Sequence, residues 1–328
     1  MNVEAQPSSP DRLDRPGRTV LVLNRRSRHG RGAREAVVEA LRRQGIRLDR
    51  VVLLRRRKMA RQLNQLFLQE PDLSRLIVGG GDGTLGVLAA RLAGRGIPLG
   101  VIPLGTANDF ARTLGIPLDI ADAAEVAAGH HVHAVDMARA NDAYFLNVAS
   151  IGMSVALTNE LSPRLKRWLG PLAYTIAGAR AFIRHPTFRA RIEGPEQSLD
   201  STVHQVVVAN GRFYGGGVLV ACDATLDDGE LTTYALGTRG RWELLRTIAL
   251  LRFQVPLNCP GDCFTQSTSI RVETWPPKPV NLDGEIRTRT PVDFVVVPGA
   301  LRVLTLEGST PGIERPAEKL TADRMSSR

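Results

Sequence analysis

The chain has 328 residues, of which 43% are hydrophobic, so it is long enough to form two globular domains with apolar cores. No run approaches the roughly 20 apolar residues of a membrane-spanning helix, and no apolar segment follows residues 1–18, so we expect a cytoplasmic protein. A net charge of +10 and a pI near 10.3 predict an anionic partner, such as a membrane surface or a phosphorylated substrate. Nucleic acid is not expected, because aromatic residues make up only 5% and no basic stretch is interleaved with them.

Strands and helices alternate in the first part of the chain. Buried strands are predicted at residues 19–24, 46–54, 75–78 and 98–103. Between them, helical periodicity is found in a segment with Ala33, Val37, Val38 and Leu41 on one face, and at residues 58–69 and 84–92. This alternation predicts a parallel, doubly wound sheet that binds ligands at the carboxyl ends of its strands.

The third of these strands runs into a glycine-rich turn, Leu76-Ile-Val-Gly-Gly-Gly-Asp-Gly-Thr84. A strand that ends in such a turn and opens a helix lets backbone N–H groups approach a phosphate. No Gly-Lys-Ser/Thr follows, so this is not a P-loop. Asp82 would repel a bare phosphate, and we interpret it as facing a divalent cation bound to the phosphate. A tight turn that needs positive φ angles is the alternative.

A second polar turn follows the fourth predicted strand, in Pro103-Leu-Gly-Thr-Ala-Asn-Asp-Phe-Ala-Arg112. Here too a glycine precedes a hydroxyl, an amide and an acid at a predicted helix start. The simpler interpretation is that Thr106 or Asn108 is an N-cap. Two polar turns at the same edge of one sheet nevertheless favour a shared pocket.

After about residue 136, short strands with glycine-rich turns predict a largely antiparallel β domain. The strands are expected at residues 144–148, 188–192, 203–209, 231–236, 269–272, 292–297 and 301–306. Two further segments, 165–184 and 241–253, combine basic and apolar residues at helical spacing. Such helices suit a membrane surface, and core helices with one charged side are the alternative.

Two acidic turns of the second part could also carry chemistry. Residues 223–231 offer carboxylates and free carbonyls, which fit either an Asp-Gly hairpin or a cation site. Asn281-Leu-Asp-Gly-Glu285 places two carboxylates around a glycine. These could accept a proton from a hydroxyl during phosphoryl transfer, or the segment could be an ordinary β-turn.

Taken together, the motifs resemble the diacylglycerol kinase catalytic family, in its branch of bacterial lipid kinases related to sphingosine and ceramide kinases. The glycine motif is shared with NAD kinases and phosphofructokinases, whereas Gly-Thr-Ala-Asn-Asp-Phe-Ala-Arg is specific to lipid kinases. The resemblance covers about residues 19–305 and is carried by Gly79-Gly-Gly-Asp-Gly-Thr84, residues 103–112, Val135-Asp136, Asn210-Gly211 with Tyr214-Gly-Gly-Gly217, Asp227-Asp-Gly229 and Leu282-Asp-Gly-Glu285.

The resemblance implies an α/β nucleotide-binding domain with a mainly parallel sheet and a second, mainly antiparallel β-rich domain, with ATP and Mg²⁺ in the cleft between them. The first domain would span residues 19–137 and be completed by a return of about 293–307, and the second would span 138–292. Residues 1–18 and 308–328 lack periodicity and are expected to be disordered tails.

Residue roles are implied by the same resemblance. Asp82, Asp109 and Asp136 would form an acidic network around the cation. Asp283, Glu285 and Asp82 would be the catalytic carboxylates, with Asp283 and Glu285 as the candidates for activating the acceptor hydroxyl. The ATP site would consist of Asn24, Ser27, Gly79, Gly80, Gly81, Asp82, Gly83, Thr84, Thr106, Asn108 and Asp109. A structural Mg²⁺ would be bound by the carboxylate of Asp228 and the backbone carbonyls of Thr225 and Glu230.

Three departures from the family pattern concern the nucleotide. The first strand is usually followed by Asn-Pro-x-Ser-Gly, and the segment Asn24-Arg-Arg-Ser-Arg28 lacks the proline and the final glycine. Gly86 stands where an asparagine is usual, and Leu54 where a threonine is usual. These changes bear on ATP affinity rather than on the fold.

We therefore expect an ATP- and Mg²⁺-dependent lipid kinase of phospholipid metabolism that acts on diacylglycerol or a related lipid, peripherally attached to an anionic membrane. A kinase of a soluble substrate, such as NAD or a sugar, is one alternative, and a catalytically inactive lipid- or nucleotide-binding protein is another. The sequence leaves open the identity of the lipid, the choice of Asp283 or Glu285 as the base, and the oligomeric state, for which a homodimer is one option.

Overall fold

The computed structural model describes residues 17–24, 32–152, 187–214, 218–219, 225–237 and 263–306. The first part of the chain contains β1 (Arg18–Asn24), α1 (Gly32–Arg43), β2 (Arg50–Leu54), a 3₁₀ turn (Arg56–Lys58), α2 (Met59–Gln69), β3 (Leu73–Gly80), α3 (Asp82–Leu92), β4 (Leu99–Pro103), α4 (Asp109–Thr113), α5 (Ile120–Ala128) and β5 (Val132–Ala140). The second part contains β6 (Ala143–Phe145), β7 (Val148–Gly152), β8 (Phe188–Glu193), β9 (Ser198–Ala209), β10 (Phe213–Tyr214), β11 (Val218–Leu219), β12 (Leu231–Gly237), β13 (Cys263–Ser267), β14 (Ser269–Trp275), β15 (Pro279–Leu282), β16 (Glu285–Arg289) and β17 (Val292–Leu304).

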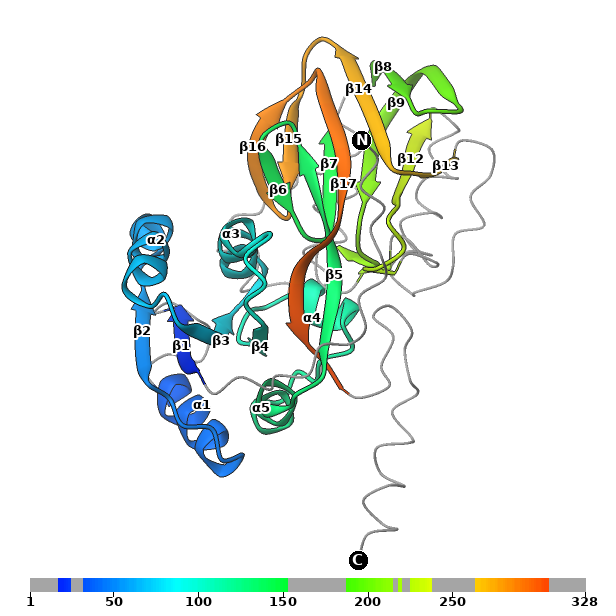
Figure 1. The fold of residues 1–328 in the computed structure, drawn as a ribbon. Helices are drawn as coiled ribbons and strands as arrows, with labels where there is room; N and C mark the ends of the chain where they lie inside the picture. Colours follow the sequence, from blue (N-terminus) through cyan, green and yellow to red (C-terminus); the bar gives the residue numbers. More distant parts are fainter. Residues whose placement is uncertain are drawn as a thin grey trace, which may run out of the picture.

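The first part is a three-layer α/β structure around four parallel strands in the order β4-β3-β1-β2. Helices α2 and α3 cover one face of these strands, and α1 and α5 cover the other (Figure 1). The inner strands β1, β3 and β4 are apolar because both of their faces are buried, as the fully buried residues Leu21 and Ile77 illustrate, whereas the edge strand β2 is partly exposed. All of these strands run in the same direction, so β1, β2 and β3 end at one edge of the sheet.

The second part is built mainly from antiparallel strands, among which β9 pairs with β7, β8 and β12. Its core is separate from that of the α/β part and includes Phe145 and Phe294, whose rings meet edge to face. The predicted architecture, a mainly parallel α/β part and a mainly antiparallel β-rich part, is thus confirmed.

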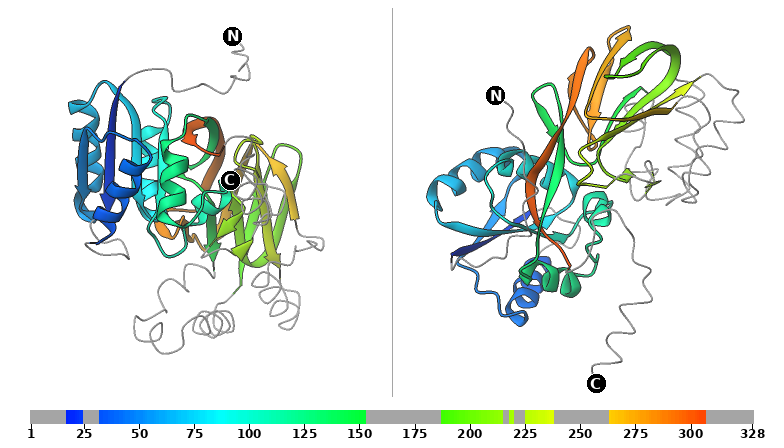
Figure 2. Two further views of the ribbon diagram at one scale, coloured as in Figure 1. Left: turned by 90° about the horizontal axis from the view of Figure 1, so that it is seen from below. Right: turned by 45° about the vertical axis from the view of Figure 1, so that its right-hand side comes forward.

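Strand β17 joins the two parts, as Figures 1 and 2 show. It pairs with β14 in the β-rich part, and Val303, near its other end, pairs in parallel with Leu99 of β4. The prediction of two separate strands, at 292–297 and 301–306, is wrong. The single strand contains an irregularity between Val297 and Leu301, where Gly299 has a φ of +57°, so the strand bends without ending.

The prediction of one strand at residues 144–148 is also wrong, because two strands share this segment: β6 ends at Phe145 and β7 begins at Val148. The predicted helices at 165–184 and 241–253 lie outside the described residues, as do the predicted tails apart from the start of β1 at Arg18. Within the described part of the chain, no helix has the length and apolar character needed to cross a membrane.

Candidate active site

The two glycine-containing turns lie directly against each other at the edge of the sheet where β3 and β4 end. The backbone N–H of Leu104 donates to the carbonyl of Gly80 over 2.9 Å. A Cβ atom on Gly105 would lie only 2.5 Å from the Cα of Gly81. Glycine is therefore required at this approach, and the two turns are held in direct backbone contact.

Side chains fix these turns from both sides. The side-chain carbonyl of Asn108 accepts a 2.8 Å hydrogen bond from the backbone N–H of Gly105. Asn108, with a φ of +53°, stands at the N-cap position of α4, but its side chain forms no cap bond to the helix and binds the second turn instead. Thr84 is buried, and its hydroxyl oxygen accepts a 2.9 Å bond from the side-chain amide of Asn24 at the end of β1. Thr106 is exposed at the second turn, and Ser27 lies outside the described residues.

Asp82 connects the two turns. Its Oδ1 atom accepts a 3.1 Å hydrogen bond from the backbone N–H of Phe110 in α4. Its Oδ2 atom accepts no hydrogen bond from the residues that the structure describes. The neighbouring Asp109 is 5% exposed, and its backbone carbonyl accepts a bond from the hydroxyl of Thr113. Asp82 is thus oriented by one oxygen while the other is available to a ligand.

Asp283 comes from the β-rich part and sits in the turn between β15 and β16. Asp283 and Gly284 have φ angles of +48° and +92°, so the predicted β-turn is present. Both carboxylate oxygens of Asp283 accept backbone hydrogen bonds, from Leu146 over 2.6 Å, Asn147 over 2.9 Å and Val148 over 3.0 Å. These N–H groups donate to the carboxylate instead of to a neighbouring strand, which is why β6 and β7 are separate strands.

A buried asparagine supports this arrangement from behind. The side-chain amide of Asn210, which is 1% exposed, donates to the carbonyl of Leu146 over 2.8 Å. It also donates to the carbonyl of Asp136 over 3.3 Å. Asn210 therefore holds the segment that binds Asp283 against β5.

The carboxylates of the β-rich part face the start of α3. A Cβ atom on Gly86 would lie 3.9 Å from Oδ2 of Asp283, and one on Gly83 would lie 4.0 Å from Oε1 of Glu285. Glu285 also accepts a 2.6 Å ion-pair hydrogen bond from Arg287 on β16. The hairpin β15–β16 thus brings two carboxylates to the glycine-rich side of the α/β part.

Burial of its carboxyl group raises the pKa of Asp283 to about 6, against the opposing effect of its three backbone hydrogen bonds. The negative charge of Asp82 raises this pKa further. Asp82 therefore lies close enough for its charge to disfavour the ionisation of Asp283. A divalent cation would relieve this repulsion, and hard carboxylate oxygens are the ligands that Mg²⁺ prefers.

The hydrogen-bond partners of Asp136 lie apart from these two groups, although the sequence predicted all three in one network. Its carboxylate, which is 4% exposed, accepts 2.8 Å bonds from the backbone N–H groups of Gly229 and Gly299. Burial raises the pKa of Asp136, and the nearby charges of Asp228 and Asp227 raise it further. Asp136 therefore joins the 225–230 loop to β17.

The predicted structural cation site lies in the same loop. The carboxylate of Asp228 accepts bonds from the backbone N–H groups of Thr225, over 2.8 Å, and Glu230, over 2.9 Å. Asp227 pairs with the imidazole of His133 over 2.9 Å. Among the described residues, no group of three or more His, Cys, Asp and Glu side chains converges as metal ligands. One carboxylate and two carbonyls remain a chemically suitable oxygen set for Mg²⁺.

Backbone N–H groups opposite a pair of carboxylates are typical of a phosphotransferase. Such an enzyme contributes positioning and charge neutralisation more than covalent chemistry. Comparison with known proteins agrees with this class. Residues 18–140 match the family model of the diacylglycerol kinase catalytic domain, and residues 147–305 match that of the YegS C-terminal NAD kinase beta sandwich-like domain.

Individual relatives extend this similarity along the chain. The diacylglycerol kinase of Staphylococcus carnosus is 31% identical over 240 residues, covering 73% of this chain and 78% of its own. A probable lipid kinase YegS-like protein of Pseudomonas aeruginosa is 36% identical over 252 residues, covering 74% and 80%. The crystal structure of a diacylglycerol kinase from Bacillus anthracis has a TM-score of 0.70 and 27% identity, covering 89% of this chain and 98% of that one. The chain belongs to the family of diacylglycerol kinases and YegS-like lipid kinases, as its motifs predicted.

Several groups of the candidate site could not be predicted from the sequence. The N–H groups of residues 146–148 bind Asp283 through the backbone, so no side chain marks them. Glu285 and Arg287 pair with each other because residues two apart on the strand β16 point to the same face of the sheet. By contrast, the spacing of glycines around Asp82 was sufficient to predict the turn.

Proposed function

We propose that the protein transfers the γ-phosphoryl group of ATP to a hydroxyl of diacylglycerol or a related lipid at the surface of a membrane. Its membership of a kinase family implies ATP as the phosphoryl donor. The observation that carries the proposal is the approach of Asp283 and Glu285 to the start of α3, where Asp82 and the glycine turn lie. Phosphoryl donor and acceptor groups would meet there.

In this proposal the N–H groups of residues 79–83 and the second turn bind the phosphates of ATP, and Asn24 and Asn108 keep the turns in place. Mg²⁺, held through Asp82 and phosphate oxygens, would neutralise charge on the phosphates. The acceptor oxygen bonds to the γ-phosphorus, the bond from that phosphorus to the bridging oxygen breaks, and ADP leaves. The proton of the hydroxyl passes to a carboxylate of the hairpin.

We assign that proton to Asp283 rather than to Glu285. A base works best when its pKa lies near the working pH, and burial raises the pKa of Asp283 to about 6. Glu285 is instead held by Arg287 over 2.6 Å, an ion pair that suits a positioning role.

Other parts of the proposal rest on the family and the loop geometry. Asp109 and Asp136 would complete the acidic network through water or phosphate oxygens, and Asp228 with the carbonyls of Thr225 and Glu230 would hold a structural Mg²⁺. The nucleotide-binding domain would span residues 19–137 with the return of 293–307, and the lipid-binding domain 138–292. The protein would be cytoplasmic and peripheral to the membrane.

The test uses purified protein with labelled ATP, Mg²⁺ and mixed micelles of diacylglycerol, monoacylglycerol, ceramide, sphingosine or phosphatidylglycerol. The expected result is label on at least one lipid. Label on a soluble acceptor such as NAD, with none on any lipid, would contradict the proposal. An Asp82→Ala variant that transferred phosphate as fast as the wild type would instead indicate a protein that does not use this site.

A further inference from the structure

The strongly basic segment at the end of β2 has no role in the site described above. Arg55, Arg57, Lys58 and Arg61 are all exposed, and none forms an ion pair with a residue in the described part of the chain. Residues 50–69 contain no acidic residue at all. We call these four residues the β2–α2 basic surface.

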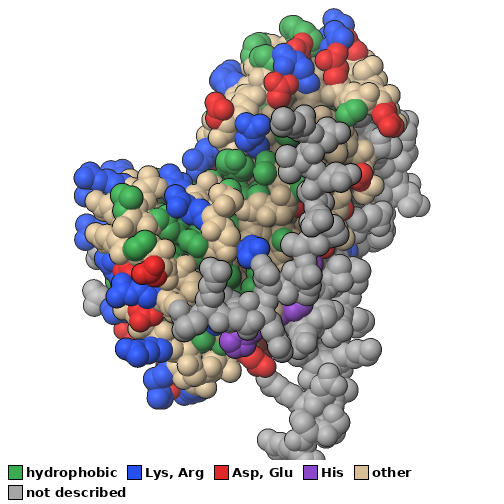
Figure 3. Space-filling model, in the orientation of Figure 1, with side chains coloured by type: hydrophobic (Ala, Val, Ile, Leu, Met, Phe, Trp, Pro, Cys, Tyr) green, Lys and Arg blue, Asp and Glu red, His purple; other side chains and the backbone are tan. Residues whose placement is uncertain are grey.

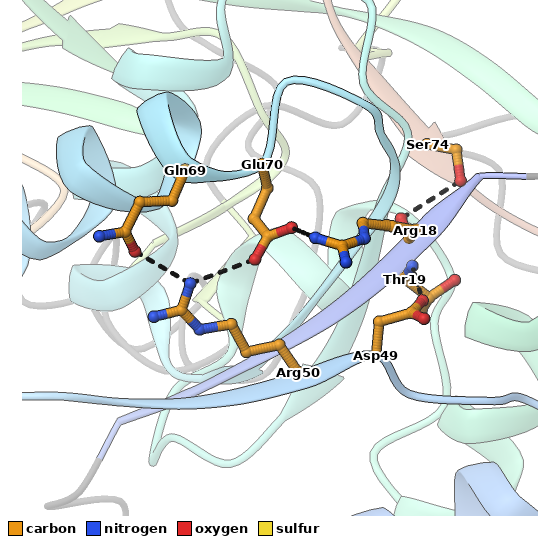
Figure 4. Close-up of polar contacts among 7 residues, drawn as sticks. All are labelled: Arg18, Thr19, Asp49, Arg50, Gln69, Glu70 and Ser74. Atoms are coloured by element: carbon orange, nitrogen blue, oxygen red, sulfur yellow. Dashed lines mark hydrogen bonds and ion pairs between the residues drawn. The ribbon is translucent and has the colours of Figure 1, made fainter.

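The opposite end of the same strand is electrically balanced. Arg50, at the start of β2, pairs with Glu70 over 3.1 Å, and Glu70 also pairs with Arg18 (Figure 4). The carboxylate of Asp49 accepts a bond from the backbone of Thr19 nearby. Acidic residues thus lie where β1 and β2 begin and are absent where β2 ends. The uncompensated positive charge of this strand pair therefore lies at the edge of the sheet where β2 ends.

That edge is the one that carries the candidate active site. β2 pairs in parallel with β1, and β1 pairs in parallel with β3, which ends in the glycine turn. Two strand spacings place the end of β2 about 10 Å from that turn. Figure 1 shows α2 and α3 side by side on the side of the sheet that faces β16, and Figure 3 shows Lys and Arg side chains along the outer edge of the lobe that carries α2.

The basic surface also contains an open cavity of about 410 Å³, lined by Leu53, Arg55, Lys58 and Gln62. The side chain of Gln62 accepts a 2.9 Å bond from the N–H of Arg55 and donates to the carbonyl of Leu53 over 3.4 Å. These bonds fix the cavity wall to α2. Leu53 is 39% exposed at its rim.

We infer that the β2–α2 basic surface docks on the headgroups of an anionic bilayer, with a lipid phosphate in the cavity between Arg55 and Lys58. Unpaired cations attract phosphodiester headgroups, and the exposed Leu53 beside them suits the interfacial region of the bilayer. Docking here would hold the active-site edge of the sheet toward the source of the lipid. The inference rests on the proposed function, because a lipid acceptor has to be reached from a membrane.

The test measures sedimentation of the full-length protein with vesicles of phosphatidylcholine, with and without phosphatidylglycerol, in the absence of ATP. The double variant Arg55→Gln/Lys58→Gln is compared with Arg43→Gln/Arg47→Gln. The control removes the same charge from exposed residues at and just after the end of α1, where Arg43 already pairs with Glu39. Each removed cation is expected to weaken binding about fivefold, so the first variant should lose about 25-fold on anionic vesicles and the control much less.

Several outcomes would overturn the inference. Equal losses in the two double variants would indicate an effect of net charge alone. Vesicle binding by Arg55→Gln/Lys58→Gln that equals the wild type would exclude membrane docking at this surface. This holds whether or not the binding of the variant to a DNA duplex falls. The charge-conserving variant Arg55→Lys/Lys58→Arg should keep vesicle binding, and its failure to do so would contradict a role based on charge.

A second readout separates docking from catalysis. With a short-chain diacylglycerol dissolved as monomers, the KM for ATP should be the same in wild type and Arg55→Gln/Lys58→Gln. A raised KM with normal vesicle binding would assign the two side chains to the nucleotide instead. If the wild type phosphorylates no lipid yet binds anionic vesicles through these residues, the proposed function fails and the docking inference stands.

Discussion

Asp283 is held by three backbone N–H groups and yet has a raised pKa, and both facts follow from its position between the two parts of the molecule. The hydrogen bonds stabilise the carboxylate, but burial and the charge of Asp82 outweigh them and raise its pKa to about 6. Like-charge neighbours with raised pKa values are characteristic of sites that handle protons or cations. The residue therefore combines a fixed orientation with a basicity suited to accepting a proton.

The first prediction concerns the pH dependence of phosphoryl transfer. If Asp283 is the base, it has to be deprotonated, so kcat/KM for the lipid should fall as the pH drops through about 6. The sign is opposite for stability, because an acid whose pKa is raised by folding destabilises the fold as the pH rises and it ionises. A pH profile of initial rates checks this, and a profile that stays flat from about pH 5 to pH 7 would contradict it.

The second prediction concerns Gly86, whose site faces Asp283. An asparagine there would start from a Cβ 3.9 Å from Oδ2 of Asp283 and bring an amide donor to that oxygen. A donor to the ionised form lowers a carboxyl pKa, so Gly86→Asn should move the acidic limb of the rate profile to lower pH. Gly32→Asn, at the start of α1 with no atom within 4 Å of a built Cβ, is the control and should leave the limb in place. If the acidic limb of the rate profile lies at the same pH in wild type and both variants, the amide does not reach Asp283.

At the scale of elements, the glycine turns matter because the ends of β3 and β4 come into backbone contact. A Cβ on Gly105 would lie 2.5 Å from the Cα of Gly81 and 2.6 Å from the side-chain oxygen of Asn108. Neither the backbone of Gly81 nor the hydrogen-bonded side chain can move without disturbing a turn. The surface that we propose to bind phosphate depends on this contact.

The third prediction follows from that contact. Gly105→Ala should separate the turns, reduce ATP affinity at least tenfold and lower the free energy of unfolding by about 1–3 kcal/mol, the usual cost of overpacking. Titration calorimetry with a non-hydrolysable ATP analogue and denaturant unfolding measure the two effects. Gly32→Ala is the matched control, since a Cβ there meets nothing. Unchanged ATP affinity in Gly105→Ala would show that nucleotide binding does not depend on the approach of the turns.

Element positions were largely predictable from the sequence, and the places where prediction failed have physical causes. Periodicity located the four parallel strands and helices α1, α2 and α3 because one face of each helix and both faces of the inner strands are buried, although β2 begins at Arg50 rather than at residue 46 and α5 was not predicted. It failed at β17, where the left-handed Gly299 lets one strand continue through a bend. It failed again between β6 and β7, where backbone N–H groups bind Asp283 from a hairpin far away in sequence. Long-range backbone contacts of this kind leave no local pattern.

The candidate site was predictable to the same extent. Asp82, Asp283 and Glu285 could be proposed from spacing and resemblance, and the structure brings the hairpin of Asp283 and Glu285 to the start of α3. The contacts of Asp136 could not be foreseen, because its partners are the N–H groups of Gly229 and Gly299. Ion pairs such as that of Glu285 with Arg287 likewise require the fold.

At the scale of the whole molecule, the two edges of the parallel sheet differ in charge and in role. One edge carries ion pairs that stabilise the fold, and the other carries the candidate active site. Glu70, 7% exposed, is shared by Arg18 and Arg50 at the edge where β1 and β2 begin (Figure 4). This cluster ties the end of α2 to two strands. The opposite edge carries the glycine turns and the β2–α2 basic surface.

The fourth prediction tests this division. Hydrogen bonds from Arg18 and Arg50 hold the pKa of Glu70 below its ordinary value, so the ion pairs stabilise the fold above that ordinary value and lose their effect as the pH falls through the lowered pKa. Glu70→Gln should therefore have a lower Tm than wild type at neutral pH, and the two Tm values should converge in acid. Its kcat should be unchanged at temperatures where both proteins are folded. A Tm difference that is independent of pH would contradict the assignment to ion pairing.

The central claim, that the meeting of the hairpin β15–β16 with the glycine turn is the site of lipid phosphorylation, is tested most directly by one comparison of initial rates. Labelled lipid is measured with wild type, Asp283→Asn and Asp293→Asn, the last changing an exposed carboxylate that pairs with Arg271 on a neighbouring strand. We expect Asp283→Asn to lose about 10²–10⁴-fold in kcat, the usual contribution of a general base, and Asp293→Asn to retain the wild-type rate. A wild-type rate in Asp283→Asn would contradict the account.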